Sequence, residues 1–436
     1  MGDDDGGNDD TAAGDVAREA LEAAGDVDVE ARRLAAWAAS GALLLDMRDA
    51  RSFARRRLRG SVNIPFHAMD GRLHELPPRT RALAVVLSEV FTEAEEAESG
   101  GGMGEDGSCA SDSGASSRAR AASYAEQARV FSADFKGLPW NVWGYFVPTA
   151  SLFGEAARRA EVGVDTTAVH PRARGRLWEP SDMVARWIPR LEERMAKEWD
   201  VEALMSLTSS AAVTDASPPA ATETEAELMR RPLCLDMGCG AGRDAVWAAL
   251  RGWRVLALDS DAKGLARCAA LARTHGVADR VTPYRVDLVH TLPTDVLALV
   301  GDGVAGLTRE RRAEGGSGSG VVTRGIEGGE GVAPVVRGPV RAVIAVRYLH
   351  RPLVHALAGL LPPAAAVCWF HFMRGAELTK VGRPNKAKDL LEAGELKKLF
   401  GEDHGWSVLG DDVVHLPDGR PISEFVTVND AKQTAS

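Results

Sequence analysis

The chain has 436 residues, of which 45% are hydrophobic and 26% are charged. Its length predicts about two to three domains, and its composition is typical of a globular protein, which excludes a collagen-like, coiled-coil or wholly disordered chain. The formal net charge is −10. Because this charge repels nucleic-acid phosphates and anionic membranes at long range, we expect neither as a partner.

Cysteine usage and the N-terminal sequence favour a reducing compartment. The five cysteines form no CxxC pair, so we expect no disulfide framework, no zinc site and no other metal ion. The first ten residues, MGDDDGGNDD, contain neither the basic nor the apolar region of a targeting peptide. No run of about 20 apolar residues is present, so we expect no membrane-spanning helix. The sequence therefore predicts a cytoplasmic protein.

Stretches rich in Gly, Ser, Ala and acidic residues interrupt the globular pattern. Such stretches bury too little apolar surface to offset the entropy of ordering the backbone, so we expect them to be flexible. They cover residues 1–26, 93–117, 208–227 and 301–338. The remaining sequence predicts two domains, residues 27–170 and residues 171–436.

The first domain is predicted to be a small α/β unit. The apolar spacing of Leu34 and Trp37 indicates a helix that starts near Val27 and ends before Gly41. Strands are expected over 42–46, 61–64 and 82–87, with a helical turn over 52–57. The aromatic stretch 138–146 is expected to pack in the core rather than to bind a ligand.

Strands and helices alternate in the second domain. An amphipathic helix is expected to begin at Ser181 or Asp182, and later helices at Asp244, Ala262 and Leu353. Apolar strands are expected over 233–236, 254–259, 281–287, 342–346 and 365–371, followed by a helix over 394–400 and strands over 407–414 and 422–428. Buried strands separated by helices indicate a parallel sheet covered on both faces, which is an α/β fold.

A glycine-rich turn, in the sequence LDMGCGAGRD, follows the first strand of this domain. Glycines allow positive φ and a close approach of a ligand to the backbone, and the N-terminus of the next helix supplies N–H donors. Gly238, Gly240 and Gly242 do not complete a dinucleotide-binding fingerprint, because Arg243 occupies the place of its third glycine. The turn therefore predicts a different nucleotide-like or carboxylate-bearing ligand.

Three acidic residues follow consecutive strands: Asp236, Asp259 and Asp287. An acid at the position of Asp259 can accept hydrogen bonds from ribose hydroxyls, and one at Asp287 can meet the exocyclic amine of an adenine. Because the carboxyl ends of parallel strands share one edge of the sheet, we expect the three acids to converge on one crevice. Helix capping is the alternative for each acid alone, but the agreement of independent spacings favours a ligand site.

With this set of residues, the segment 176–428 resembles the class I S-adenosylmethionine-dependent methyltransferases. The resemblance implies a Rossmann-like domain with a mostly parallel, seven-stranded sheet, and S-adenosylmethionine as the cofactor. It also implies that the three glycines pass under the methionyl part of the cofactor. Asp236 would then orient the amino group, Asp259 would hold the ribose and Asp287 would meet the adenine.

A methyl acceptor is expected above the fourth strand, because methyl transfer needs an acceptor lone pair aligned behind the methyl carbon. The candidate pocket residues are Arg347, Tyr348, His350 and His371, with packing or helix capping as the alternative for each. The segments 347–353, 382–384 and 391–396 are similar to the tellurite-resistance-type branch of the family. A thiol, sulfide or a chalcogen oxyanion is a conceivable acceptor, and the pattern assigns no catalytic residue.

The N-terminal unit is similar to the rhodanese-like family in the sequences LDMRDARSF and GSVNIP. This resemblance covers residues 29–169 and implies that Asp46 and Arg48 fix the fold. Two departures are evident, because Arg57 replaces the usual His and Ser88 stands where the catalytic Cys is expected. A hydroxyl cannot replace a thiolate as a sulfur carrier, and Cys109 has no neighbour in sequence that lowers its thiol pKa. We therefore expect no sulfur transfer.

Two functional hypotheses follow from these patterns. The first is an S-adenosylmethionine-dependent enzyme that methylates a small molecule and carries an inactive rhodanese-like domain. The alternative is a binding or scaffold protein that uses both domains to recognise partners. The intact glycine turn and the acids at the strand ends favour the enzyme, because a decayed site would tolerate bulky residues there. The sequence assigns no oligomeric state.

Overall fold

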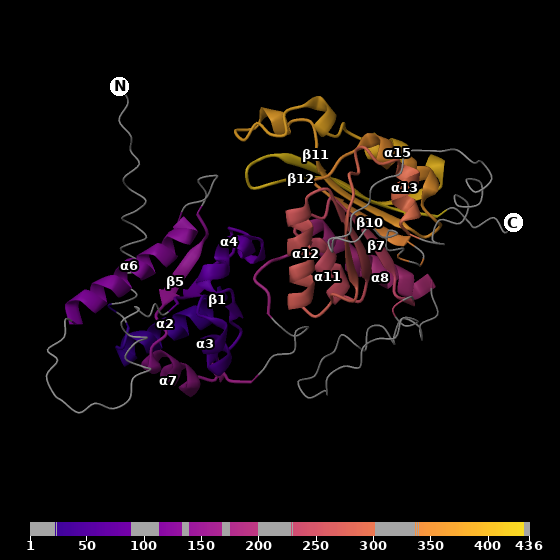
Figure 1. Cartoon of the computed structure of the whole chain (residues 1–436). Coiled ribbons are helices and arrows are strands. Elements are labelled where there is room, and N and C mark those ends of the chain that lie inside the picture. The colour runs from indigo at the N-terminus through magenta and orange to yellow at the C-terminus, as the bar shows by residue number, and fades with distance from the viewer. Residues whose placement is uncertain are drawn as a thin grey trace, which may run out of the picture. The chain divides into compact units, whose positions relative to one another are not determined.

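The structure is a computed structural model (Figure 1). It describes residues 22, 24–88, 113–132, 139–167, 175–198, 228, 230–300, 336, 338 and 340–430. The chain divides into two compact units. The first comprises Met1–His170 with Arg174–Glu179, and the second comprises Pro171–Ala173 with Pro180–Ser436. Each unit is described by itself.

The N-terminal unit contains a four-stranded parallel sheet in the order β3-β1-β4-β5. Its strands are β1 (Leu43–Asp46), β3 (Val62–Asn63), β4 (Leu83–Val86) and β5 (Val142–Phe146). A separate antiparallel pair is formed by β2 (Arg57–Leu58) and β6 (Val164–Asp165). The helices are α2 (Val27–Ser40), α3 (Ala50–Arg55), α4 (Met69–Arg72), α6 (Ser113–Ser132) and α7 (Ala150–Arg158), with short 3₁₀ turns η1 (Phe66–Ala68) and η2 (Leu73–Glu75).

Helices cover both faces of this sheet. Successive residues of a strand point to opposite faces, and in β1 they pack against different helices. Leu45 and Val85 belong to a buried cluster that includes Phe131 of α6. Leu44 belongs to a second cluster, which includes Trp37 of α2 and further residues of α7. The unit is therefore a three-layer α/β/α arrangement, and its sheet is buried on both sides.

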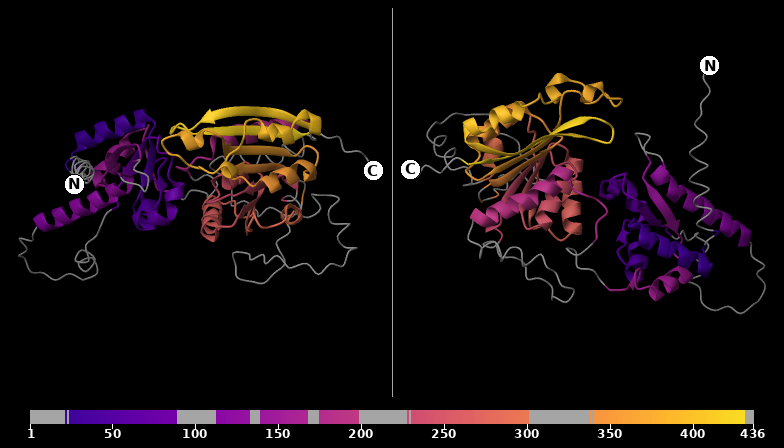
Figure 2. Two further views of the ribbon diagram at one scale, coloured as in Figure 1. Left: turned by 90° about the horizontal axis from the view of Figure 1, so that it is seen from above. Right: turned by 180° about the vertical axis from the view of Figure 1, so that it is seen from behind.

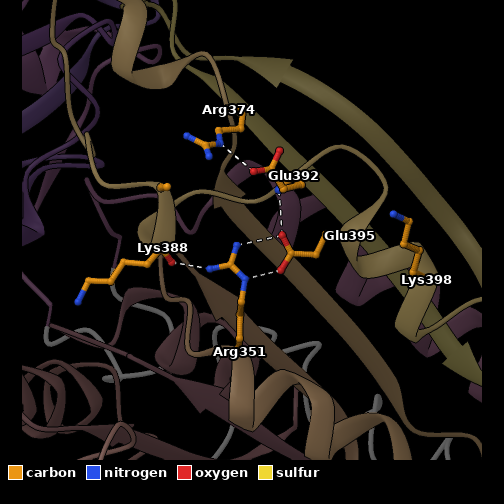
Figure 3. A pocket seen from close by; sticks show the side chains of 7 residues that line it. Arg351, Arg374, Lys388, Glu392, Glu395 and Lys398 are labelled. Carbon is orange, nitrogen blue, oxygen red and sulfur yellow. Dashed lines mark hydrogen bonds and ion pairs between the residues drawn. The ribbon is translucent and has the colours of Figure 1, made fainter.

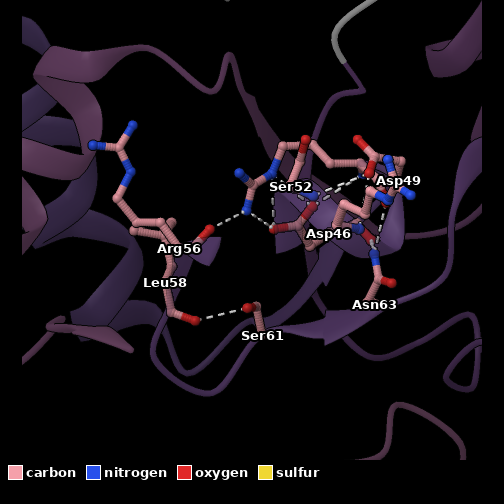
Figure 4. Close-up of polar contacts among 9 residues, drawn as sticks. Asp46, Asp49, Ser52, Arg56, Leu58, Ser61 and Asn63 are labelled. Carbon is pink, nitrogen blue, oxygen red and sulfur yellow. Dashed lines mark hydrogen bonds and ion pairs between the residues drawn. The ribbon is translucent and has the colours of Figure 1, made fainter. Parts of the chain in front are cut away.

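A buried polar network joins the first strand of the N-terminal unit to the loop that follows it (Figure 4). The Arg48 guanidinium donates to both carboxylate oxygens of Asp46, with Nη2 at 2.6 Å from Oδ2, and also donates to the carbonyl of Arg56. Asn63 donates its amide to the carbonyls of Asp46 and Arg48 at 2.9 and 2.8 Å. The roles expected for Asp46 and Arg48 in the fold therefore agree with their contacts.

The C-terminal unit is built on a seven-stranded sheet in the order β12-β13-β11-β10-β7-β8-β9. Its strands are β7 (Leu233–Met237), β8 (Arg254–Asp259), β9 (Val281–Arg285), β10 (Val340–Val346), β11 (Ala366–Phe372), β12 (Trp406–His415) and β13 (Pro421–Asn429). The first five in chain order are parallel, whereas β13 runs antiparallel to both β11 and β12. The β12–β13 pair is drawn in yellow in Figure 2.

Helices and short turns connect these strands. The helices are α8 (Asp182–Glu198), α11 (Arg243–Leu250), α12 (Ala262–Thr274), α13 (Pro293–Ala298), α15 (Arg351–Leu360) and α16 (Glu395–Leu399). The 3₁₀ turns are η5 (Ala376–Leu378), η6 (Ala387–Asp389) and η7 (Glu402–His404). A buried cluster joins one face of β7, β8 and β10 to α13 and α15. Helices α11 and α12 contribute nothing to it and pack against β8 and β9, so they cover the opposite face.

The strand order reverses beside β7, because the chain passes outward through β8 and β9 and then returns to β10 on the other side. Such a reversal opens a crevice at the carboxyl ends of the two central strands, where open α/β sheets bind their ligands. The loops after β7 and β10 lie at these carboxyl ends. They contain the predicted glycine turn and three of the predicted acceptor-pocket residues.

Most of the expected elements are present with ends that differ by at most two residues. The structure adds the helices α4, α6, α7 and α13 and the strands β2, β5 and β6, which were not expected. Helix α6 begins at Ser113, inside the segment 93–117 that was expected to be flexible, and Val336 forms a parallel bridge with Val300 near the end of the segment 301–338. Residues 93–112, 208–227 and 301–335 lie outside the described residues.

Among the described residues, no helix is both long and apolar enough to cross a membrane.

Candidate functional site

The glycine turn between β7 and α11 has the left-handed backbone that its sequence predicts. Gly238, Gly240 and Gly242 have φ angles of 74°, 54° and 77°. Two N–H groups of the turn, those of Gly238 and Cys239, donate to the carbonyl of Leu258 on the neighbouring strand at 2.8 and 3.0 Å. Because L-residues with a side chain rarely adopt such angles, glycine is required at these positions.

The three glycines differ in what surrounds them. A Cβ atom at Gly238 would lie 2.9 Å from Cβ of Tyr348, and one at Gly242 would lie 2.2 Å from Sγ of Cys268. A Cβ at Gly240 would meet no atom within 4 Å. Gly238 and Gly242 therefore permit close packing within the protein, whereas Gly240 faces open space at the position where the sequence predicts a ligand.

Asp236, the acid at the end of β7, is buried with one oxygen unpaired. Its exposed fraction is 2%, and Oδ2 has no hydrogen-bond partner among the described residues. Burial, followed by the charges of Asp244 and Asp259, raises the pKa of Asp236 well above its ordinary value, while the backbone N–H of Ala245 opposes this shift. Because an unpaired buried acceptor destabilises a fold, this oxygen is suited to a hydrogen-bond donor from outside the chain.

Asp259, at the end of β8, fixes the shape of the turn. Its Oδ2 accepts the N–H of Gly240 at 2.8 Å, and its Oδ1 accepts the N–H of Asp261 at 2.9 Å. Each carboxylate oxygen can accept a further hydrogen bond, and the residue is partly exposed. Asp259 thus has a structural function that its spacing did not indicate, and it retains the capacity to bind hydroxyl groups.

Asp287 lies in an exposed turn after β9, where its carboxylate has local partners. Its Oδ1 accepts the N–H of Val289 at 3.0 Å, and its Oδ2 lies 2.8 Å from Nδ1 of His290. The hydrogen bond with His290 is the main cause that lowers the pKa of Asp287. Asp287 therefore stabilises a local turn and does not cap the next helix, α13, whose N-cap residue is Leu292.

Two of the predicted acceptor-pocket residues border the glycine turn. Tyr348 packs against Gly238, and its buried hydroxyl has no hydrogen-bond partner among the described residues. Burial, with smaller contributions from Asp287 and Asp259, raises the pKa of Tyr348. Arg347, the preceding residue, has a φ of 58°, and its N–H donates to the carbonyl of Phe370 at 2.7 Å.

The other two candidates lie further along the same edge. His350 immediately precedes α15, and its Nδ1 is buried without a partner among the described residues. His371 on β11 lies with Nε2 3.0 Å from the carbonyl of Asp389, while its Nδ1 is buried and unpartnered within the described part of the chain. Burial is the main cause that lowers the pKa of His371, so its neutral form is favoured.

A surface pocket lies between α15, η6 and α16 (Figure 3). Its lining residues are Arg351, Arg374, Ala387, Lys388, Glu392, Glu395 and Lys398. Arg351 donates to both carboxylate oxygens of Glu395 at 2.6 and 2.9 Å, and Arg374 donates to Glu392 at 2.8 Å. Both arginines of this pocket are therefore neutralised by acidic partners. Arg351 also donates to the carbonyls of Lys388 and Leu390, which flank Asp389, the contact of His371, so the pocket lies beside His371.

Two residues that position the turn were not singled out as site residues from the sequence. Gly264 of α12 allows that helix to approach the turn, because a Cβ there would lie 2.9 Å from the carbonyl oxygen of Gly240. Asp244 of α11 accepts the N–H of Ser181 at 2.6 Å and so ties the start of α8 to the turn. Only the glycine was readable as a signal, since it interrupts an otherwise regular helix.

The position predicted for a rhodanese-type nucleophile is filled by Ser88, at the carboxyl end of β4. Its N–H donates to Oε1 of Gln127 at 2.7 Å, and its carbonyl accepts from Nε2 of the same side chain at 3.0 Å. Gln127 belongs to α6 and is fully buried. The backbone N–H and carbonyl of Ser88 are thus engaged within the unit. Cys109 lies outside the described residues.

Among the described residues, no group of three or more His, Cys, Asp or Glu side chains is arranged to hold a metal ion.

Comparisons with known proteins give distant similarities. No known family profile matches the chain. "Uncharacterized protein UNK4.09" of Schizosaccharomyces pombe is 25% identical over 193 residues, which are 43% of this chain and 54% of that protein. The chain therefore spans about half the length of the curated relative it matches.

Similar solved structures include S-adenosylmethionine-dependent methyltransferases. Magnesium protoporphyrin IX methyltransferase (ChlM) from Synechocystis PCC 6803, with bound SAH, is 14% identical over 56% of this chain and 88% of its own, with a TM-score of 0.30. TehB from Haemophilus influenzae is 12% identical over 55% of this chain and 65% of its own, with a TM-score of 0.28. The rhodanese-like resemblance of the N-terminal unit stays a prediction.

Proposed function

We propose that the C-terminal unit binds S-adenosylmethionine at the glycine turn and transfers its methyl group to a small-molecule acceptor. The observation that carries this proposal is the open space at Gly240 together with the unpaired, buried oxygen of Asp236. A turn that served only to connect β7 to α11 would need neither feature, and the buried oxygen would only destabilise it. A ligand with an amino group accounts for both.

The residues of the turn fit this cofactor in the roles that the family resemblance implies. The open backbone at Gly240 leaves room for the methionyl part, and Oδ2 of Asp236 is available to accept from the amino group. Asp259 is partly exposed and can accept from ribose hydroxyls while it holds Gly240. Asp287 would meet the adenine beside the His290 that now pairs with it.

Bound S-adenosylmethionine would supply an electrophilic methyl group on a positively charged sulfur. The chain itself would hold the acceptor in line with that methyl, which can account for much of the rate enhancement. Tyr348 is placed for this task, because it packs against Gly238 and has an unpaired hydroxyl. His371 is favoured in its neutral form, and with Nε2–H donated to Asp389 its Nδ1 can accept a proton.

For the N-terminal unit we propose a rhodanese-like domain without sulfur-transfer activity. The parallel sheet, the Asp46–Arg48 pair after β1 and the position of Ser88 after β4 support this assignment. The lack of a thiol at that position supports inactivity, because a serine hydroxyl does not ionise near neutral pH. The bonds between Ser88 and Gln127 further engage a backbone N–H that an anion cradle would need.

The proposal is tested by methyl transfer from labelled S-adenosylmethionine into a metabolite extract. The full chain is expected to label at least one small molecule, and the Gly240→Val variant is expected to label none, because its side chain would fill the open space at the turn. Equal labelling by both proteins would contradict the site. No labelling by a chain that does bind S-adenosylmethionine would favour a binding protein instead.

A further inference from the structure

Arginine side chains gather at the carboxyl ends of β10 and β11, beside the proposed cofactor site. Arg347 follows β10 directly, and its φ of 58° is disfavoured for any residue with a side chain. Backbone conformations of this kind persist where the surrounding structure holds them, and they cluster at functional sites. Here the hydrogen bond from the Arg347 N–H to the Phe370 carbonyl, at 2.7 Å, holds the residue in place.

Two guanidinium groups share the ring of Phe372, the last residue of β11. The Cζ atom of Arg420 lies 4.6 Å from the ring centroid, and that of Arg347 lies 5.9 Å from it. Arg420 is neutralised by Asp418, whose Oδ2 accepts from Nη2 at 2.7 Å. Arg347 is exposed, and its guanidinium makes no hydrogen bond or ion pair with a described residue.

A second unpaired arginine, Arg243, begins α11 immediately after the glycine turn. It is exposed and forms no hydrogen bond or ion pair within the described part of the chain. Strands β7 and β10 are neighbours in the sheet, and Tyr348, the residue after Arg347, packs against Gly238, so both arginines follow the carboxyl ends of adjacent strands. Partial loss of solvent, then the charges of Arg420 and Arg243, lowers the pKa of Arg347, while Asp418 and Asp244 oppose this shift. Asp244 and Asp418 partly offset the repulsion between these cations, but within the described part of the chain neither forms a hydrogen bond or ion pair with Arg347 or Arg243.

We propose that Arg347 and Arg243 bind an anionic group, a carboxylate or a phosphate, on the methyl acceptor. This assignment rests on the proposed function and specifies the class of its substrate. An oxyanion between the two guanidinium groups would relieve their mutual repulsion and would accept paired N–H donors from the planar fork of Arg347. It would also anchor the acceptor next to Gly242 and Tyr348.

The pocket of Figure 3 is a weaker candidate for the same anion. Its two arginines already bind Glu395 and Glu392, so an anion there would have to compete with these carboxylates. Arg374 has an exposed side chain and a single hydrogen-bonded acidic partner on a separate segment. It therefore provides a matched control for the loss of one arginine near the same edge of the sheet.

The test is isothermal titration of the full chain with benzoate and with phenyl phosphate, at one fixed ionic strength. At least one of the two anions is expected to bind, and Arg347→Gln is expected to weaken that binding about tenfold or more, since it removes a charge-assisted pair of bonds. Arg243→Gln is expected to weaken it as well, and Arg374→Gln to leave it unchanged. Arg347→Lys keeps the charge without the fork and is expected to bind with intermediate affinity.

Three results would overturn the assignment: no binding of either anion, unchanged binding by Arg347→Gln, or equal weakening by Arg374→Gln. S-adenosylhomocysteine is titrated separately into each variant, and the Arg347→Gln variant is expected to bind it as the parent chain does. If S-adenosylhomocysteine fails to bind the parent chain, the proposed function is contradicted. The anion titrations do not require S-adenosylhomocysteine, so they still decide whether these arginines form an anion site.

Discussion

In each of the two units a loop follows a buried parallel strand, but the polar groups near these loops differ in whether they have hydrogen-bond partners. In the N-terminal unit, both carboxylate oxygens of Asp46 accept from Arg48, and both backbone groups of Ser88 are bonded to Gln127. In the C-terminal unit, an oxygen of Asp236 is buried without a partner, and the turn at Gly240 faces open space. A satisfied network stabilises a scaffold, whereas an unsatisfied one indicates a place for a ligand.

The largest expected effect is on the stability of the N-terminal unit, whose polar groups are paired. Asp46→Ala leaves the buried Arg48 guanidinium without its carboxylate, so we expect the N-terminal unit to lose about 3–5 kcal/mol of unfolding free energy. Chemical denaturation followed by circular dichroism measures this loss. Asp49→Ala, which removes only the exposed cap of α3, should cost about 1 kcal/mol.

The affinity of the Asp46→Ala variant for S-adenosylhomocysteine tests whether the change in the N-terminal unit leaves binding by the C-terminal unit unaffected. Because Asp46 lies in the other unit, we expect this affinity to stay within about twofold of the parent value where the chain remains folded. An equal loss of stability in Asp46→Ala and Asp49→Ala would show that the buried pair does not hold the fold.

A large effect on binding is expected at Gly240. Gly240→Val places a branched side chain in the open space of the turn, so affinity for S-adenosylmethionine should fall by more than about a hundredfold, measured by isothermal titration. The positive φ adds a strain of about 1–2 kcal/mol. Gly394→Val is the control, because Gly394 has a φ of 70° and open surroundings but lies at the start of α16. If both variants bind equally well, the turn does not contact the cofactor.

Opposite changes in stability and affinity are expected at Asp236. Asp236→Asn replaces a buried acid, whose raised pKa reflects the cost of ionising it there, with a neutral amide. At pH values above that pKa we expect the free protein to gain about 1–3 kcal/mol, while affinity for S-adenosylmethionine falls about ten- to a hundredfold. Thermal unfolding and titration calorimetry measure the two quantities. A variant that lost stability and kept its affinity would assign Asp236 to the scaffold.

The pH dependence at Asp236 follows from its raised pKa. The folded protein holds a proton there at pH values where the unfolded chain has lost it, so the unfolding free energy of the free protein falls as pH rises through this interval. Binding of the cofactor's amino group requires the carboxylate, so affinity should fall as pH is lowered through the raised pKa, by at most about tenfold per pH unit. Titration of Asp236→Asn over the same range should show neither dependence.

The smallest expected effect is on sulfur transfer. The parent chain should form no thiocyanate from thiosulfate and cyanide, because Ser88 stands at the position of the nucleophile. Ser88→Cys is expected to restore none, since Gln127 occupies the N–H that would help to stabilise a thiolate. Thiocyanate formation by the parent chain that Cys109→Ser abolished would overturn this account of the N-terminal unit.

Much of the C-terminal unit was predictable because its signals are local. A strand, a glycine turn and a helix follow one another without a break. Spacing alone therefore predicted that Gly238, Gly240 and Gly242 form the turn between them. Contacts between distant segments could not be predicted, as Gln127 reaches Ser88 across 39 positions. Helix α6 was missed although its sequence is rich in Ala and contains several Arg, which have high helix propensity.

The partners of individual side chains in the site could not be predicted from the sequence. The position of Asp287 after β9 was expected, but its pairing with His290 depends on the local turn and competes with the predicted contact to adenine. Arg347 was expected in the acceptor pocket as one of several candidates, while its left-handed backbone depends on how β10 meets β11. Spacing thus locates a strand-end residue, and only the packed neighbours decide what it binds.

Hydrogen–deuterium exchange of the full chain, with and without S-adenosylhomocysteine, tests the contrast between the two units most directly. The account predicts slower exchange in peptides that cover 233–246 and 256–262, because a ligand at the turn shields and orders these N–H groups. Exchange in peptides that cover 43–49 and 83–88 should not change. Protection confined to the N-terminal unit, or no protection anywhere at saturating ligand, would contradict it.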